Sequence, residues 1–87
     1  MLELYQAEGC PNSTDVRETL TGLGVSYVIH NPRRPGAEGG DTLNERTQQA
    51  MLDLGSEDSI PFLVDTSRGE TLHESEAIVE YLERHYQ

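Results

Sequence analysis

The chain opens with a short alternation of apolar and polar residues and continues with apolar residues at helical spacing. Leu2-Glu3-Leu4-Tyr5 alternates with a period of two, which predicts a strand. Val16, Leu20 and Leu23 then recur on one helical face, which predicts a helix. Residues 25–29 are rich in β-branched side chains and predict a second strand. The opening is therefore a β-α-β unit, whose two strands are parallel and joined by a right-handed crossover.

A segment rich in proline, glycine and arginine separates this unit from the next helix. Residues 31–40 predict a mobile loop, with a glycine-rich patch at 36–40. Thr42 and Glu45 match a capping box at a helix start. The predicted helix runs to Gly55, and its apolar face consists of Leu43, Thr47, Ala50, Met51 and Leu54.

The C-terminal part predicts a β-hairpin and a last helix. Residues 60–65 form an apolar strand with Pro61 at its entrance, and turn residues 66–69 lead to a strand at 70–73. An amphipathic helix starts at Ser75, with an apolar face of Ala77, Ile78, Tyr81, Leu82 and His85. The order is β-α-β-α-β-β-α, in one small domain over residues 1–87.

Charge and composition restrict the partners of this domain. Sixteen acidic residues stand against six basic ones, all arginine, and the net charge is −10. Such a charge argues against nucleic acid and anionic lipid as partners. The apolar stretches are too short for a membrane span, and the N-terminus lacks a signal-peptide pattern, so we expect a cytoplasmic protein. The acidic, lysine-free composition resembles that of proteins from salt-accumulating halophiles, especially halophilic archaea.

The single cysteine is the strongest candidate for chemistry. Cys10 follows the first strand and precedes Pro11, so it falls at a helix start, where free backbone N–H groups favour negative charge. The thiolate is the form that attacks disulfides, so this position suits redox or thiol-transfer chemistry; a buried core cysteine is the alternative. One cysteine forms no internal disulfide, which fits a reducing compartment. His30, His73 and His85 show no metal-ligand spacing, and no metal site is predicted.

Three separated motifs carry a family resemblance over essentially the whole chain. Cys10-Pro11 at the first helix start, Ile60-Pro61 at a strand entrance and Glu74-Ser75 before the last helix resemble the glutaredoxin branch of the thioredoxin fold. They resemble the N-terminal domain of glutathione transferases equally. The resemblance implies a thioredoxin-like, glutaredoxin-type α/β fold. Its four-stranded mixed sheet would be ordered second, first, third, fourth, with helices on both faces.

The resemblance also implies roles for these motifs. Cys10 matches the nucleophile, and Pro61 matches a cis-proline opposite it, which lets the backbone of Ile60 pair with a peptide-like thiol. Glu74-Ser75 resembles the transferase motif that holds the α-amino and α-carboxylate groups of a γ-glutamyl group. A simple helix cap at Ser75 is the alternative. No tightly bound cofactor is implied; the co-substrate is a small thiol, glutathione or γ-glutamylcysteine, the latter favoured in a halophilic archaeon.

Two departures from the family pattern limit the chemistry. Ser13 stands where many glutaredoxins have a second cysteine, so only a monothiol route remains; Ser13 either donates a hydrogen bond to the Cys10 thiolate or is an ordinary first-turn residue. Glu8 occupies a place where the family often has a basic residue, and its charge opposes thiolate formation. The sequence Cys10-Pro11-Asn12-Ser13 also differs from the Cys-Gly-Phe-Ser form of cluster carriers, which disfavours a shared iron–sulfur cluster.

The sequence therefore predicts a monothiol glutaredoxin-like thiol–disulfide oxidoreductase that acts on mixed-disulfide proteins with a γ-glutamyl thiol. Two alternatives stay open. One is a transferase-type thiol-binding domain, although the helical domain that builds an electrophile pocket is not expected in this chain; the other is a non-enzymatic thioredoxin-fold adaptor. Arg33 and Arg34 could reach the far carboxylate of a peptide thiol, but a solvated loop is the favoured interpretation. The catalytic candidates are Cys10, Pro11 and Ser13, and the thiol-binding candidates are Ile60, Pro61, Glu74 and Ser75.

Overall fold

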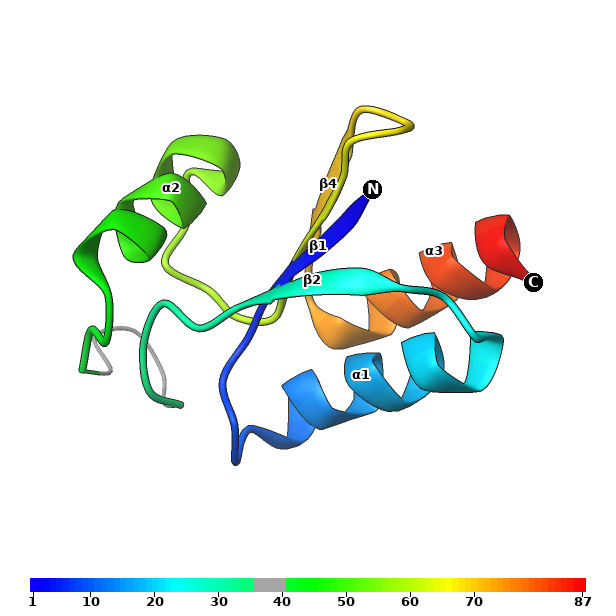
Figure 1. Cartoon of the computed structure of the whole chain (residues 1–87), viewed down its shortest axis with the longest axis horizontal. Coiled ribbons are helices and arrows are strands. Elements are labelled where there is room, and N and C mark those ends of the chain that lie inside the picture. Colours follow the sequence, from blue (N-terminus) through cyan, green and yellow to red (C-terminus); the bar gives the residue numbers. More distant parts are fainter. Residues whose placement is uncertain (36–40) are drawn as a thin grey trace.

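A computed structural model describes residues 1–35 and 41–87, and there the helices and strands follow the predicted order (Figure 1). The glycine-rich patch predicted at 36–40 lies outside the described residues. Of the described helices, none is long and apolar enough to cross a membrane. The strands are β1 Leu2–Tyr5, β2 Tyr27–His30, β3 Phe62–Asp65 and β4 Glu70–His73, and the helices are α1 Pro11–Leu23, α2 Glu45–Gly55 and α3 Ser75–Tyr86.

The strands form a mixed four-stranded sheet in the predicted order β2-β1-β3-β4. β1 pairs in parallel with β2 and antiparallel with β3, and β4 completes the hairpin with β3. Leu4 of β1 therefore lies between Ile29 and Leu63. Helices α1 and α3 lie side by side on one face of the sheet and α2 lies on the other (Figure 1). The strand order and the helices on both faces confirm the predicted architecture.

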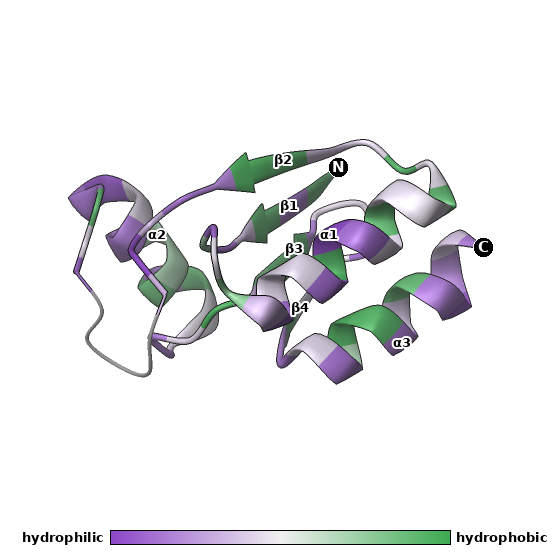
Figure 2. Cartoon of the chain, turned by 90° about the horizontal axis from the view of Figure 1, so that it is seen from below, coloured by the Kyte–Doolittle hydropathy of each residue, from purple (hydrophilic) through white to green (hydrophobic). Residues whose placement is uncertain are grey.

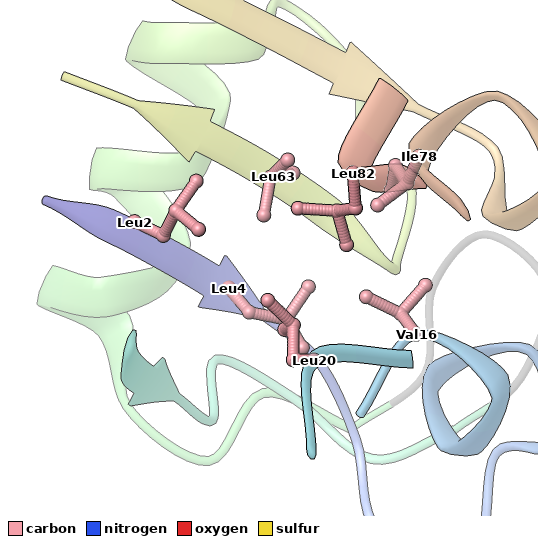
Figure 3. Close-up of a cluster of buried hydrophobic side chains, with 7 residues drawn as sticks. All are labelled: Leu2, Leu4, Val16, Leu20, Leu63, Ile78 and Leu82. Carbon is pink, nitrogen blue, oxygen red and sulfur yellow. The ribbon is translucent and has the colours of Figure 1, made fainter. Parts of the chain in front are cut away.

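Alternating side chains of the strands build a core on each face of the sheet. The core beneath α1 and α3 contains Leu2, Leu4, Val16, Leu20, Leu63, Ile78 and Leu82 (Figure 3). The core beneath α2 is smaller and contains Tyr5, Met51, Phe62 and Val64. Figure 2 shows hydrophobic residues along the strands and mixed hydrophilic and hydrophobic residues along the helices. Both faces of β1 and β3 thus contribute to a core, because successive residues of a strand point to opposite faces.

The start of α2 corrects the predicted capping box. The helix begins at Glu45, and its N-cap is Asn44, whose side-chain oxygen accepts a hydrogen bond from the backbone N–H of Thr47 at 3.0 Å. Thr42 instead pairs with Arg33 in an isolated β-bridge. Asparagine is among the best N-cap residues, so it defines the start of the helix better than the Thr42–Glu45 pair does. Leu43 consequently precedes the helix and is 53% exposed.

Some predicted boundaries and apolar faces also differ. The second and third strands are Tyr27–His30 and Phe62–Asp65, rather than 25–29 and 60–65. On the helices, Leu54, Ala77 and His85 are exposed, so these predicted face positions do not reach the core. α1 ends at Leu23, after which Gly24 takes the left-handed conformation that closes a helix.

A buried carboxylate anchors the C-terminal half of α3 to the sheet. Asp65 accepts hydrogen bonds from the hydroxyls of Tyr81 at 2.8 Å and Tyr86 at 2.5 Å, and from the backbone N–H of Ser67 at 3.1 Å. Burial alone would raise the pKa of Asp65, but these hydrogen bonds together lower it. Burial and the hydrogen bond to Asp65 raise the pKa of Tyr81 to about 12. The sequence pattern marked Asp65 only as the end of an apolar strand.

Candidate functional site

Cys10 lies at the start of α1, as predicted. It is the N-cap residue, with Pro11 directly after it, and its side chain is half-buried. Its carbonyl oxygen accepts two hydrogen bonds from Thr14, one from the backbone N–H at 3.0 Å and one from the hydroxyl at 3.1 Å. Gly9 makes the turn before it with a φ of 80°, a conformation that glycine adopts at little cost.

Ser13 stabilises the loop that carries Cys10. It is fully buried, and its hydroxyl oxygen accepts a hydrogen bond from the backbone N–H of Ala7 at 3.3 Å. The backbone N–H of Cys10 donates to the carbonyl of the same Ala7 at 3.4 Å. Ser13 thus links the first turn of α1 to the loop that follows β1. A hydrogen bond from Ser13 to the Cys10 thiolate stays a prediction.

The peptide bond between Ile60 and Pro61 is cis, as the resemblance implied. Pro61 is buried and leads directly into β3, whose first residue, Phe62, pairs with Tyr5 at the end of β1. Because β1 and β3 are antiparallel, the entrance of β3 lies beside the exit of β1. The Ile60-Pro61 segment and the loop to Cys10 are therefore at the same edge of the sheet.

Glu74 and Ser75 form the junction between β4 and α3. The N-cap is Glu74, whose side chain makes no capping hydrogen bond, and Ser75 is the first residue inside the helix. The alternative of Ser75 as a simple helix cap is therefore wrong. Glu74 has φ 70° and ψ 124°, an uncommon conformation for any residue except glycine. Strained backbone conformations of this kind cluster at functional sites.

A cavity of about 410 Å³ brings the predicted binding residues together. All four thiol-binding candidates line it, namely Ile60, Pro61, Glu74 and Ser75. Three further residues, Asn12, Ser59 and Glu76, line the cavity and were not among the predicted site residues. Each of them is within two positions of a predicted site residue, which is the signal that could have found them. Cys10, Pro11 and Ser13 do not line this cavity, and the first turn of α1 reaches it through Asn12.

The cavity combines two kinds of polar group. Its walls include the start of α3, whose first backbone N–H groups have no partner within the helix and favour a carboxylate. They also include Glu74 and Glu76, acidic residues of the kind that suits an ammonium group. Both charges occur on an α-amino acid. Among the described residues, no group of three or more histidine, cysteine or acidic side chains is arranged to hold a metal ion.

Glu8 forms an ion pair that its sequence neighbourhood does not indicate. Glu8 Oε2 lies 3.2 Å from a guanidinium nitrogen of Arg17, which comes from the second turn of α1. A partner nine positions further along the chain gives no local signal in the sequence. The effect of this pair on a Cys10 thiolate stays a prediction.

Arg33 also corrects a prediction, since it is not part of a solvated loop. Arg33 is only 2% exposed, and its Nε lies 2.7 Å from Asp58 Oδ1. The same carboxylate oxygen accepts a hydrogen bond from the side-chain amide of Gln48 at 3.0 Å. A buried guanidinium requires such a partner. The pair ties the segment after β2 to the segment that leads to Ser59 and the cavity. Arg34, in contrast, is exposed as predicted.

Comparison with known families agrees with this geometry. The sequence model of the glutathione S-transferase N-terminal domain matches residues 4–87. The chain belongs to this family. Comparison with curated protein sequences gives no match.

Solved glutathione transferases have the same fold. A diazinon-metabolizing glutathione S-transferase of the silkworm Bombyx mori is 29% identical, with a TM-score of 0.75 over 100% of this chain and 38% of that one. Glutathione transferase E6 of Drosophila melanogaster is 26% identical, with a TM-score of 0.75 over 99% of this chain and 35% of that one. Transferase URE2P6 of Phanerochaete chrysosporium, in complex with oxidized glutathione, is 28% identical, with a TM-score of 0.71 over 98% of this chain and 36% of that one. The chain thus has the predicted thioredoxin-like fold and spans little more than a third of these relatives.

Proposed function

We propose that this domain binds a γ-glutamyl thiol in the cavity at the start of α3 and exchanges it with mixed disulfides through Cys10. The observation that carries the proposal is the cavity of about 410 Å³, lined by Ile60, Pro61, Glu74 and Ser75 from two separate segments. The resemblance assigned a thiol-binding role to these four residues. The complex of the P. chrysosporium relative with oxidized glutathione supports the same ligand class.

The proposed binding mode uses the polar groups of the cavity. The α-carboxylate of the γ-glutamyl group accepts hydrogen bonds from the first backbone N–H groups of α3 and from the hydroxyl of Ser75. The α-ammonium group pairs with the carboxylate of Glu74. The backbone of Ile60 pairs with the cysteinyl part of the ligand. Glutathione and γ-glutamylcysteine share all three of these groups, so both are ligands in this proposal.

The exchange reaction needs only thiols and disulfides. The Cys10 thiolate attacks the γ-glutamyl thiol's sulfur in a mixed disulfide, a new disulfide with Cys10 forms, and the substrate protein leaves as a thiolate that takes up a proton. A second γ-glutamyl thiol, as its thiolate, then attacks the disulfide on Cys10. The products are a reduced protein thiol, the symmetrical γ-glutamyl disulfide and the Cys10 thiolate. The partners are mixed-disulfide proteins in a reducing compartment, for which the cytoplasm is our proposal.

Family membership favours a second candidate function. The matching transferases are almost three times as long as this chain, which covers 38% of the silkworm enzyme. In this alternative the domain binds the thiol in the same cavity and activates its sulfur for attack on an electrophile. Cys10 then forms no covalent bond, and a mixed disulfide is not its substrate.

Reduction of a mixed disulfide between glutathione and a small thiol separates the two functions. The disulfide product would be followed with the wild type and with Cys10→Ser. This product is oxidized glutathione when glutathione is the reductant, and the mixed disulfide of glutathione with γ-glutamylcysteine when γ-glutamylcysteine is the reductant. We expect turnover that Cys10→Ser abolishes. Turnover that persists in Cys10→Ser, or no turnover with either thiol, would reject the exchange reaction. Conjugation of glutathione to an aromatic electrophile by both variants alike would establish the transferase alternative.

A further inference from the structure

We infer that Arg17 is a positioning residue for Cys10, which holds the loop before this cysteine and neutralises the carboxylate of Glu8. The inference rests on the proposed function, in which Cys10 is the nucleophile. It adds a residue that lies outside the cavity.

One guanidinium group joins three parts of the chain around this loop. In Arg17, Nη1 contacts Gln6 Oε1 and lies 3.2 Å from Glu8 Oε2, and Nη2 donates a hydrogen bond to Thr14 Oγ1 at 3.2 Å. Gln6 is buried just after β1, Glu8 belongs to the loop, and Thr14 belongs to the first turn of α1. The side chain of Arg17 is itself only 22% exposed. These contacts fix the guanidinium between the end of the strand and the start of the helix.

The contacts of Arg17 continue to Cys10 and to the neighbouring strand. The Thr14 hydroxyl that accepts from Arg17 also donates to the carbonyl of Cys10 at 3.1 Å. On the other side, the Gln6 amide donates to Asn31 Oδ1 at 2.5 Å, just after β2. Hydrogen-bonded side chains polarise one another and rigidify the segments that they join. Removing Arg17 therefore loosens the loop at both ends.

Arg17 also places a positive charge beside the carboxylate of Glu8. The protein has a net charge of −10, and Glu8 stands two positions before Cys10. A carboxylate without a partner at this place disfavours the thiolate, whereas a nearby cation favours it. The side chain of Glu8 is 78% exposed, so this effect is strongest at low ionic strength. Arginine suits the task because its planar group offers several donors in a fixed geometry, which lysine does not.

The test is the rate at which iodoacetamide, an uncharged reagent, alkylates Cys10 in the full chain at fixed pH and low salt. The variants are Arg17→Ala, Glu8→Gln and the double variant. Arg84→Ala is the matched control, because Arg84 forms an exposed ion pair with Glu80 within α3. Urea unfolding of each variant reports its stability separately.

We expect Arg17→Ala to slow alkylation by about threefold or more. Glu8→Gln in the Arg17→Ala background should restore most of the rate, because it removes the carboxylate that lost its partner. Glu8→Gln alone should raise the rate above that of the wild type, and Arg84→Ala should leave it unchanged. Because Glu8 is exposed, Glu8→Gln keeps the test decisive even if Arg17→Ala does not fold.

Two results would overturn the inference. One is an unchanged rate in Glu8→Gln; the other is a slow rate in folded Arg17→Ala that Glu8→Gln does not restore, since Arg17 would then have only a structural role. Alkylation requires no γ-glutamyl thiol. Failure of this inference is therefore distinct from failure of the proposed function, which shows itself as a wild type that does not reduce the mixed disulfide.

Discussion

Replacing Asp65 by alanine should destabilise the domain by about 3 kcal/mol without changing the cavity. The carboxylate is buried and accepts three hydrogen bonds, from Tyr81, Tyr86 and the backbone of Ser67. Each hydrogen bond to a charged group contributes about 1.5–3 kcal/mol. Both tyrosines are partly exposed, so in the variant their hydroxyls form hydrogen bonds to water and recover part of this free energy. The remaining loss is large for a domain of this size, whose total stability is typically about 5–10 kcal/mol.

The same cluster predicts how stability depends on pH. The pKa of Asp65 is lowered from 3.8, so its contribution is complete above about pH 4 and is lost as the pH falls through the folded-state pKa. The pKa of Tyr81 is raised from 10.0 to about 12, so its contribution is complete below about pH 10 and is lost as the pH rises toward that value. Asp65→Ala should reduce both pH dependences.

Urea unfolding followed by far-ultraviolet circular dichroism measures these effects. Tyr86→Phe should cost about 1–2 kcal/mol in the wild type and much less in Asp65→Ala, because the partner is already gone. Equal costs of Tyr86→Phe in the two backgrounds, or an Asp65→Ala variant within about 0.5 kcal/mol of the wild type, would refute the reasoning.

Three further predictions concern the backbone and the surface charge. Gly55→Ala should destabilise the domain by about 1–3 kcal/mol in the same assay, because a Cβ there would lie 2.8 Å from His73 Nε2 and 2.9 Å from Phe62 Cζ; an unchanged midpoint would contradict this. Glu74→Gly should be about 1 kcal/mol more stable than Glu74→Ala, because φ is 70° at this position and glycine adopts this conformation without strain. If the alanine variant is the more stable one, as at most positions, the backbone at Glu74 is not strained. Potassium chloride should raise the urea midpoint, since a cavity of about 730 Å³ between α1 and α3 gathers five acidic residues, whose repulsion the exposed Glu80–Arg84 ion pair offsets only in part. A flat or falling midpoint would mean that the fold offsets the whole of this repulsion. The five acidic residues are Asp15, Glu18, Glu76, Glu80 and Glu83.

Local patterns predicted the sheet and the helix order well. The strands 2–5 and 70–73 and the start of α3 at Ser75 agree with the sequence analysis, because each has a regular pattern and a clear turn beside it. The predicted start of α2 was wrong because Asn44 and Thr42 are both able to cap a helix, and only the folded backbone decides between them. Local sequence patterns distinguish element types better than they fix element ends.

Contacts between distant residues account for most of what the sequence did not predict. The burial of Arg33 depends on Asp58, which is 25 positions away, and an arginine in a proline-rich segment has no local sign of such a partner. The pairing of Glu8 with Arg17 likewise required the loop to fold back over α1. Three short motifs in a fixed order indicated the four thiol-binding candidates that share the cavity, whereas Ser59 and Glu76 belong to none of these motifs.

Calorimetric titration with S-methylglutathione, which has no free thiol to oxidise, tests the central claim most directly. The wild type, Ser75→Ala and the remote control Arg84→Ala would be titrated under the same conditions, and urea unfolding would verify that each is folded. We predict that the wild type and Arg84→Ala bind alike and that Ser75→Ala binds about tenfold more weakly, since a hydrogen bond to a charged ligand group contributes about 1.4 kcal/mol or more. A wild type that does not bind, or a folded Ser75→Ala that binds with unchanged affinity, would contradict the account.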